Sequence, residues 1–358
     1  MKIISTVALF LTTFLLFLNL LHNKNDQEMK LNEIQVIGSH NSYKIAIEEP
    51  LFNYLLEKNE ALEALQYDHI PLSAQLNLGL RGLELDVYHD PEGGHYTNPK
   101  GLSIVKAAGK EPIPYDVEKK LEAPGLKMFH VQDVDFRSHQ LVFKDALKEL
   151  KKWSQEHEGH TPVIITINAK DAEVPLTRKP LPFTAEALLT IDEEIREVFE
   201  QKSLITPDLI TGDFENLEQA VLTKGWPSLK ELKNRFLFVL DEGDEKTDAY
   251  LSNFSNLHGA VLFVDKEEGN PNAGFKILND PIKDFNKIEK LVKLGYMVRT
   301  RADADTKEAR NNDYTRFEKA KASGAQVITT DYYLPSQYFD SDFKIIFDNG
   351  GYEKSIQD

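Results

Sequence analysis

The sequence predicts an α/β fold, a single distorted TIM-type (β/α)8 barrel. Short apolar runs rich in β-branched residues alternate with longer amphipathic stretches, which is the pattern of repeated strand–helix units. The length of 358 residues also suits one such barrel with added loops. We expect eight strands, at residues 34–37, 82–87, 127–130, 163–167, 236–240, 260–264, 296–300 and 326–329.

The amphipathic stretches predict the helices that separate the strands. In residues 142–153, apolar side chains recur every three or four residues and charged ones occupy the other face. The segments at 90–124 and 170–183 are rich in Gly and Pro, so we expect loops there. Loops that leave the C-terminal ends of barrel strands build the active site. Further helical stripes lie at residues 52–65, 185–199, 282–294 and 307–322.

Composition excludes several classes of protein. The formal net charge of -16 repels nucleic-acid phosphate, so we expect no nucleic-acid partner. The same charge opposes docking on an anionic membrane, so a lipid substrate must be reached through apolar contacts or a bound cation during transient membrane contact. The chain has no cysteine, which excludes disulfides and thiolate metal ligands. We infer no protein partner.

The N-terminal segment has the composition of a targeting signal. Lys2 precedes a largely apolar run over residues 3–21, so residues 1–22 read as a signal peptide or an N-terminal anchor. The run approaches the roughly 20 residues that span a bilayer, and no small-x-small cleavage site follows it cleanly. We expect export to the periplasm or the extracellular medium. Residues 23–30 are a connector, and residues 31–358 form the barrel.

Two histidines stand at expected strand ends. His40 lies in Gly-Ser-His-Asn-Ser-Tyr at 38–43, just after the first strand, and His130 ends the third. Imidazole titrates near neutrality, so two rings on opposite sides of one phosphate can act as base and acid. A histidine that only caps a strand end by hydrogen bonds is the alternative. Other histidines that compete for these roles are His89, His95, His139, His157 and His160.

Two carboxylates share one face of the second strand. Glu84 and Asp86 are separated by one residue, so their side chains point the same way. Their charges repel unless a cation or strong hydrogen-bond donors compensate. Together with Asn41 they offer oxygen ligands that suit calcium or magnesium. The alternative is that they pair with Arg81 or Arg137.

The ends of the fourth and seventh strands carry further polar candidates. Asn168 and Lys170 share a face, where the amide could complete an oxygen cage and the ammonium could bind a phosphate. Arg299 and Arg301 likewise share a face, where guanidinium groups would suit an anionic substrate. The alternative partners of the two arginines are Asp303 and Asp305.

Three of these motifs carry a resemblance. Gly-Ser-His-Asn-Ser-Tyr at 38–43, Glu-Leu-Asp at 84–86 and the His130 segment with the helix ending in Trp153 resemble the calcium-dependent phosphoinositide phospholipase C family. The resemblance extends to the wider group of phospholipase C-like phosphodiesterase barrels. It implies that His40 is the general base on the inositol 2-hydroxyl. His130 would then protonate the departing diacylglycerol oxygen, leaving a cyclic inositol phosphate.

The resemblance also implies a calcium site, with one departure. Calcium would be held at Asn41, Glu84 and Asp86 and would lower the pKa of the attacking hydroxyl. Better-known members carry a glutamate after the fourth strand, where this chain has Asn168. The loss of one negative charge predicts weaker calcium binding, which an extracellular site would tolerate. Asp171 is the nearby substitute.

Two other functions remain open. The strand at 84–87 and Thr-Thr-Asp-Tyr at 329–332 also resemble glycerophosphodiester phosphodiesterases. That family usually has His-Arg-Gly after its first strand, whereas this chain has Asn41 after His40. The third hypothesis is a non-catalytic inositol-phosphate or lipid binding protein, suggested by the neutral Asn168.

Overall fold

The structure is a computed structural model that describes residues 29–356. The expected signal peptide or anchor at 1–22 and most of the connector at 23–30 lie outside the described residues, so both stay predictions. Within residues 29–356, no helix combines the length and the apolar character needed to cross a membrane.

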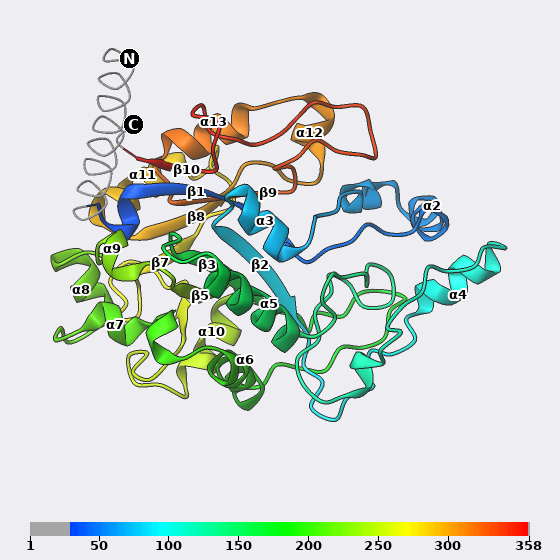
Figure 1. The fold of residues 1–358 in the computed structure, drawn as a ribbon, viewed down its shortest axis with the longest axis horizontal. Coiled ribbons are helices and arrows are strands. Elements are labelled where there is room, and N and C mark those ends of the chain that lie inside the picture. The colour runs from blue at the N-terminus through cyan, green and yellow to red at the C-terminus, as the bar shows by residue number, and fades with distance from the viewer. Residues whose placement is uncertain (1–28, 357–358) are drawn as a thin grey trace, which may run out of the picture.

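A curled ten-stranded sheet forms the centre of the molecule (Figure 1). Its neighbours run in the order β4-β5-β3-β2-β1-β9-β8-β7, with β6 paired to β5 and β10 paired antiparallel to β1. All other pairs are parallel. The strands are β1 Ile34–Ser39, β2 Gly82–Val87, β3 Val163–Ala169, β4 Leu204–Ile205, β5 Phe236–Leu240, β6 Leu262–Val264, β7 Phe275–Ile277, β8 Met297–Arg301, β9 Val327–Thr330 and β10 Glu353–Ser355.

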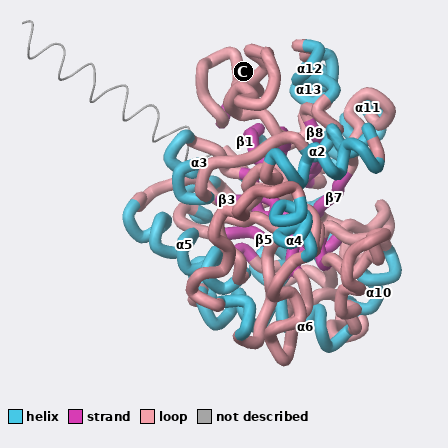
Figure 2. Tube along the Cα trace, turned by 90° about the vertical axis from the view of Figure 1, so that its right-hand side faces the viewer, coloured by secondary structure: helices cyan, strands magenta, loops and turns pink. Residues whose placement is uncertain are grey.

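Helices surround the strands, which Figure 2 shows at the centre of the molecule. Short 3-10 helices occur at Leu31–Glu33, Glu60–Leu65, Lys120–Glu122 and Gln201–Ser203. The α-helices are α2 Glu49–Lys58, α3 Leu72–Leu78, α4 Lys100–Ala107, α5 Phe143–Glu156, α6 Ala185–Val198, α7 Pro207–Thr211, α8 Leu217–Thr223, α9 Leu229–Leu232, α10 Asp244–Leu251, α11 Phe285–Leu294, α12 Lys307–Asn311 and α13 Thr315–Ala322.

The parallel strands follow one another around a barrel, which confirms the predicted fold class. An isolated parallel bridge between Asp265 and Phe275 joins the β6 side to β7. The ring therefore runs β1, β2, β3, β5, β6, β7, β8 and β9 and returns to β1. It is distorted, because the seam between β1 and β2 has a single residue pair, Gly38 with Gly82.

One predicted strand is wrong. Residues 127–130 form no strand, and only Lys127 pairs, through isolated bridges to Tyr88 and Val142. The apolar run exists because Phe129 is buried against the Tyr88 ring, with the ring centroids 4.3 Å apart. Burial in a loop thus produced the pattern that predicted a barrel strand.

The strand that completes the ring in its place is β7, which the sequence did not predict. It has only three residues, and Lys276 interrupts its apolar pattern. The Lys276 ammonium is buried, and it binds Asp265 and the carbonyl oxygen of Lys266. A buried lysine with carboxylate and carbonyl partners has no signature in a hydropathy pattern.

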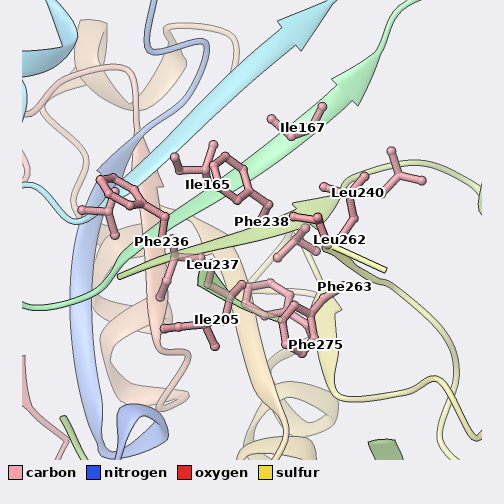
Figure 3. Packing of buried hydrophobic residues seen from close by; sticks show 14 of the residues in the cluster. Ile165, Ile167, Ile205, Phe236, Leu237, Phe238, Leu240, Leu262, Phe263 and Phe275 are labelled. Carbon is pink, nitrogen blue, oxygen red and sulfur yellow. The ribbon is translucent and has the colours of Figure 1, made fainter. Parts of the chain in front are cut away.

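Around β5, the strands of the barrel are covered by apolar side chains on both faces. All residues of β5 are buried, and Phe236, Phe238 and Leu240 pack beside Ile165 and Ile167 of β3 (Figure 3). Strands covered on both faces read as continuous apolar runs rather than alternating ones. This explains why β5 was predicted with correct bounds. The expected stripe of α5 is also buried, as Phe143, Ala146, Leu147, Leu150 and Trp153.

Two glycines set the close approach of β1 and β2. A Cβ atom on Gly38 would lie 2.6 Å from backbone atoms of Gly82, closer than real Cβ contacts allow. This contact fixes where the loop after β1 meets the end of β2, and both strands carry predicted site residues.

We predict that Gly38→Ala lowers the free energy of unfolding by about 1–3 kcal/mol, because the added methyl must push two backbones apart. Urea denaturation measures the change. Gly243→Ala is the control, since Gly243 has an ordinary φ of -69 and open space around its Cβ position. The control should change stability by less than about 1 kcal/mol. Equal effects of the two substitutions would contradict the packing argument.

Candidate active site

The loop after β1 is tied to β2 by hydrogen bonds. Asn41 adopts a left-handed backbone with φ 49, which asparagine tolerates, and this turns the chain over the end of β2. The Ser42 backbone NH donates to the Glu84 carbonyl oxygen at 2.9 Å, and the Glu84 NH donates to Ser42 Oγ at 2.8 Å. As a result, His40 Nε2 lies 3.6 Å from Glu84 Oε1.

His40 is held in one tautomer by two charged neighbours. Its Nδ1 lies 2.8 Å from Asp331 Oδ1, and its Nε2 lies 3.3 Å from Arg301 Nη1. An ionised carboxylate only accepts and a guanidinium only donates, so Nδ1 carries the proton and Nε2 offers its lone pair. Burial, followed by the charge of Arg301, lowers the pKa of His40 well below 6.5. The ring is therefore neutral near neutral pH and can accept a proton.

His130 reaches the same region from a loop rather than a strand. The Tyr88 backbone pairs with Lys127 just beyond the end of β2, and Tyr88 Oη donates to the His130 carbonyl oxygen at 3.0 Å. His130 Nδ1 lies 2.8 Å from Asp135 Oδ2. The charge on His130 contributes to the lowered pKa of His40, so the two rings are within electrostatic reach of each other.

Asp135 is a buried anion shared between two cationic groups. Its Oδ1 lies 2.9 Å from the Nζ of Lys44, and neither side chain is exposed. Burial alone would raise the pKa of Asp135, but Lys44 and His130 hold it below its ordinary value. Asp135 is thus ionised and accepts the Nδ1 proton of His130, which leaves Nε2 of that ring for proton exchange.

Glu84 and Asp86 are compensated by cations other than the two arginines considered from sequence. Arg299 binds Glu84 Oε2 through Nη2, and Lys170 Nζ lies 3.2 Å from Asp86 Oδ2. Arg81 instead packs over the Trp153 ring at 5.2 Å, and Arg137 pairs with Glu48. The alternative of pairing with Arg81 or Arg137 is therefore wrong, although Glu84 does pair with an arginine, Arg299.

The predicted calcium ligands fit a hard cation. Both carboxylate oxygens of Asp86 are buried and have no hydrogen-bond partner, which leaves a charge that needs further compensation. Asn168 pairs with Asp86 in the β2–β3 register, and its Nδ2 lies 3.4 Å from Glu84 Oε1. Among residues 29–356, no three His, Cys, Asp or Glu side chains are grouped to hold a metal ion. Calcium binding would therefore also need the amide oxygens of Asn41 and Asn168.

Comparison with known proteins identifies the family. A sequence model of the family described as phosphoinositide phospholipase C, Ca2+-dependent, matches residues 29–356. The chain belongs to this family. It is therefore a phosphoric diester hydrolase of the phospholipase C type, and calcium is its cofactor. No curated protein matches the chain.

Solved structures of bacterial phospholipases C share the barrel. A calcium-dependent phosphoinositol-specific phospholipase C from Pseudomonas sp, in its myoinositol complex, has a TM-score of 0.57 and 14% identity, covering 93% of this chain and 97% of that one. A Ca2+-dependent phosphatidylinositol-specific enzyme from Streptomyces antibioticus has a TM-score of 0.53 and 16% identity, covering 85% and 95%. At these identities the likeness supports the fold.

The two predicted substrate arginines of this phospholipase C lie at different depths. Arg299 is only 1% exposed and also contacts Asn279 and Asp241. Arg301 is 16% exposed and donates to Asp331 Oδ2 at 3.2 Å. Asp303 and Asp305 form other contacts: Asp303 accepts hydrogen bonds from Thr330 Oγ1 and the Asp331 NH, and Asp305 pairs with Lys307.

Several polar residues at this centre were not predicted from sequence. Asp331 follows β9 directly, so the argument that selected His40 after β1 could have found it. Asp135 lies in a turn five residues after His130, and Lys44 is a wholly buried lysine. Nothing in the sequence pattern distinguishes these two from solvated loop residues. A third histidine, His69, was also missed.

His69 supports the loop that carries His40. Its Nε2 lies 2.7 Å from the His40 carbonyl oxygen, and its ring stacks on Tyr333 at 5.3 Å. The side chain is buried and its Nδ1 has no hydrogen-bond partner. Burial lowers the pKa of His69 to about 4, so the ring is neutral in the folded protein. Of the competing histidines, His139 in turn contacts the His69 carbonyl oxygen at 2.6 Å.

We predict that His69 makes stability depend on pH. Its pKa is about 4 when folded, against 6.5 for a free histidine, so the unfolded chain binds more protons between these values. Stability should fall as the pH drops through this window. From pH 7.5 to pH 5, His69 should account for a loss of about 2 kcal/mol. Between pH 7.5 and pH 5, the His69→Gln variant should therefore lose about 2 kcal/mol less stability than the wild type. Urea denaturation at both pH values measures the difference.

The control is His258→Gln, because the His258 side chain is 85% exposed. It should keep the pH dependence of the wild type. If His69→Gln also keeps it, the histidine is not held neutral in the folded protein.

Proposed function

We propose that the protein cleaves phosphatidylinositol-type lipids into diacylglycerol and a cyclic inositol phosphate, with His40 as general base and His130 as general acid. One observation carries this proposal. Each histidine has its Nδ1 at 2.8 Å from a carboxylate oxygen, that of Asp331 for His40 and that of Asp135 for His130. Each ring therefore has one nitrogen, Nε2, for proton exchange, and a fixed anion to stabilise its charged form.

In the first half of the reaction, His40 Nε2 accepts the proton of the inositol 2-hydroxyl. The hydroxyl oxygen then forms a bond to phosphorus. The imidazolium that results lies against Asp331, whose charge stabilises it. The lowered pKa of His40 ensures that the ring begins the reaction neutral near neutral pH.

In the second half, the bond between phosphorus and the diacylglycerol oxygen breaks. His130 begins this step protonated and gives the Nε2 proton to the departing oxygen. Asp135 accepts the hydrogen bond from Nδ1 throughout, so the ring keeps its orientation. The products are neutral diacylglycerol and a cyclic phosphodiester of inositol, and the two histidines exchange protonation states.

Asn41, Glu84, Asp86 and Asn168 would hold the calcium ion. When bound, calcium supplies charge that lowers the pKa of the hydroxyl and offsets charge at the reacting phosphate. The neutral Asn168 supports a site of low affinity, suited to a calcium-rich medium outside the cell. Export through residues 1–22, with or without cleavage, fits such a medium.

Contact with a membrane surface would be apolar. Val117 is 78% exposed and Leu176 is 75% exposed, and both lie in the long loops that follow β2 and β3. The Lys100 ammonium donates to the Leu176 carbonyl oxygen at 2.7 Å, which ties the two loops together. Because the net charge of the chain is -16, apolar side chains at this end suit transient docking better than electrostatic attraction would.

We predict that His40→Ala and His130→Ala each reduce the rate on phosphatidylinositol vesicles by about 10²–10⁴-fold, the usual contribution of a general acid or base. Both variants should keep the circular dichroism spectrum of the wild type. His258→Ala, at an exposed histidine, should keep wild-type activity.

Wild-type rates in either variant would refute the assigned roles. Product analysis by phosphorus NMR separates the rival functions. A cyclic inositol phosphate supports the proposal, whereas turnover of glycerophosphocholine favours a glycerophosphodiester phosphodiesterase. Retained inositol-phosphate binding without turnover would favour a binding protein.

A further inference from the structure

Asp86, a proposed calcium ligand, already has a cation beside it. Lys170 Nζ lies 3.2 Å from Asp86 Oδ2. We propose that Lys170 is a displaceable counterion: it neutralises Asp86 while calcium is absent, weakens calcium binding, and moves to the substrate phosphate when calcium takes its place. This inference rests on the calcium site of the proposed function.

The contact between the two side chains is ionic but poorly formed. Asp86 is only 1% exposed, yet neither of its oxygens has a hydrogen-bond partner, so Lys170 approaches the carboxylate without good hydrogen-bond geometry. A buried carboxylate in this state is under-compensated. It would therefore gain from exchanging a single ammonium, which contacts one of its oxygens, for a divalent ion that its oxygens can ligate directly.

Lys170 is more exposed and has fewer ion-pair partners than Arg299. The Lys170 side chain is 31% exposed and pairs with Asp86, while its backbone NH donates to the Val87 carbonyl oxygen at 2.8 Å. Arg299 is 1% exposed and contacts Glu84, Asn279 and Asp241. If calcium displaces one of the two cations beside Glu84 and Asp86, we therefore expect it to displace Lys170.

The cations already beside the two carboxylates oppose calcium binding. Glu84 and Asp86 carry two negative charges, and Arg299 and Lys170 carry two positive ones. A divalent ion that binds Asp86 is repelled by the Lys170 ammonium beside it, so the ion binds more tightly when that ammonium moves away.

The displaced ammonium has a use. Lys170 follows β3 at the end of the barrel where both catalytic histidines lie, so a short movement of its side chain brings it toward a bound phosphate. Calcium and an anionic substrate would then bind cooperatively, because calcium releases the lysine that the phosphate needs.

The test is calcium binding to the full chain by isothermal titration calorimetry, without substrate. Lys170→Gln removes the competing charge, so its dissociation constant for calcium should be about tenfold lower than that of the wild type. Lys170→Arg keeps the charge and should bind as weakly as the wild type. Lys144→Gln is the matched control, because Lys144 pairs with Glu197 on the outer helices α5 and α6. It should leave calcium binding unchanged.

The other outcomes separate the two ideas. If Lys170→Gln binds calcium as weakly as the wild type while Asp86→Asn loses binding, the counterion role is overturned and the calcium site stands. If Lys144→Gln tightens binding as much as Lys170→Gln, the effect is one of net charge, and the role of Lys170 is again overturned. If the wild type and Lys170→Gln both fail to bind calcium, the inference and the proposed calcium site fall together.

Discussion

Two adjacent carboxylates buried at the end of β2 are the constraint on which this site depends. Glu84 and Asp86 point to one face of a strand and are at most 5% exposed, so their charges must be balanced nearby. The closed barrel supplies that balance from strands far apart in sequence. Arg299 comes from β8 and Lys170 follows β3, while His40 follows β1. The barrel thus concentrates charge that no single segment could stabilise.

A second layer of anions orders the two imidazoles. Asp331 and Asp135 each accept a hydrogen bond at Nδ1, and each is itself bound by a cation, Arg301 or Lys44. Carboxylates that are held in this way keep the rings in fixed orientations. The same structural pattern therefore occurs twice.

The sequence predicted the parts of this arrangement that follow from strand periodicity. It located the buried strands and therefore Glu84 and Asp86, because side chains two apart on a strand share a face. It placed His130 on a strand that does not exist, since burial of Phe129 in a loop gives the same apolar run. It could not find Lys44, because a buried lysine depends on a partner, Asp135, that only the fold brings to it. The hydropathy pattern of a sequence predicts which residues pack in the core. It does not predict ion pairs between residues that are far apart in the sequence.

A crystal structure with calcium and myo-inositol 1-phosphate would test the central claim most directly. The account predicts that Nε2 of His40 and Nε2 of His130 approach oxygens on opposite sides of one phosphorus, with Asp86 on the metal and Lys170 turned toward the phosphate. It would be contradicted if both rings lay on the same side of the phosphorus, or if the metal were bound without Glu84 and Asp86.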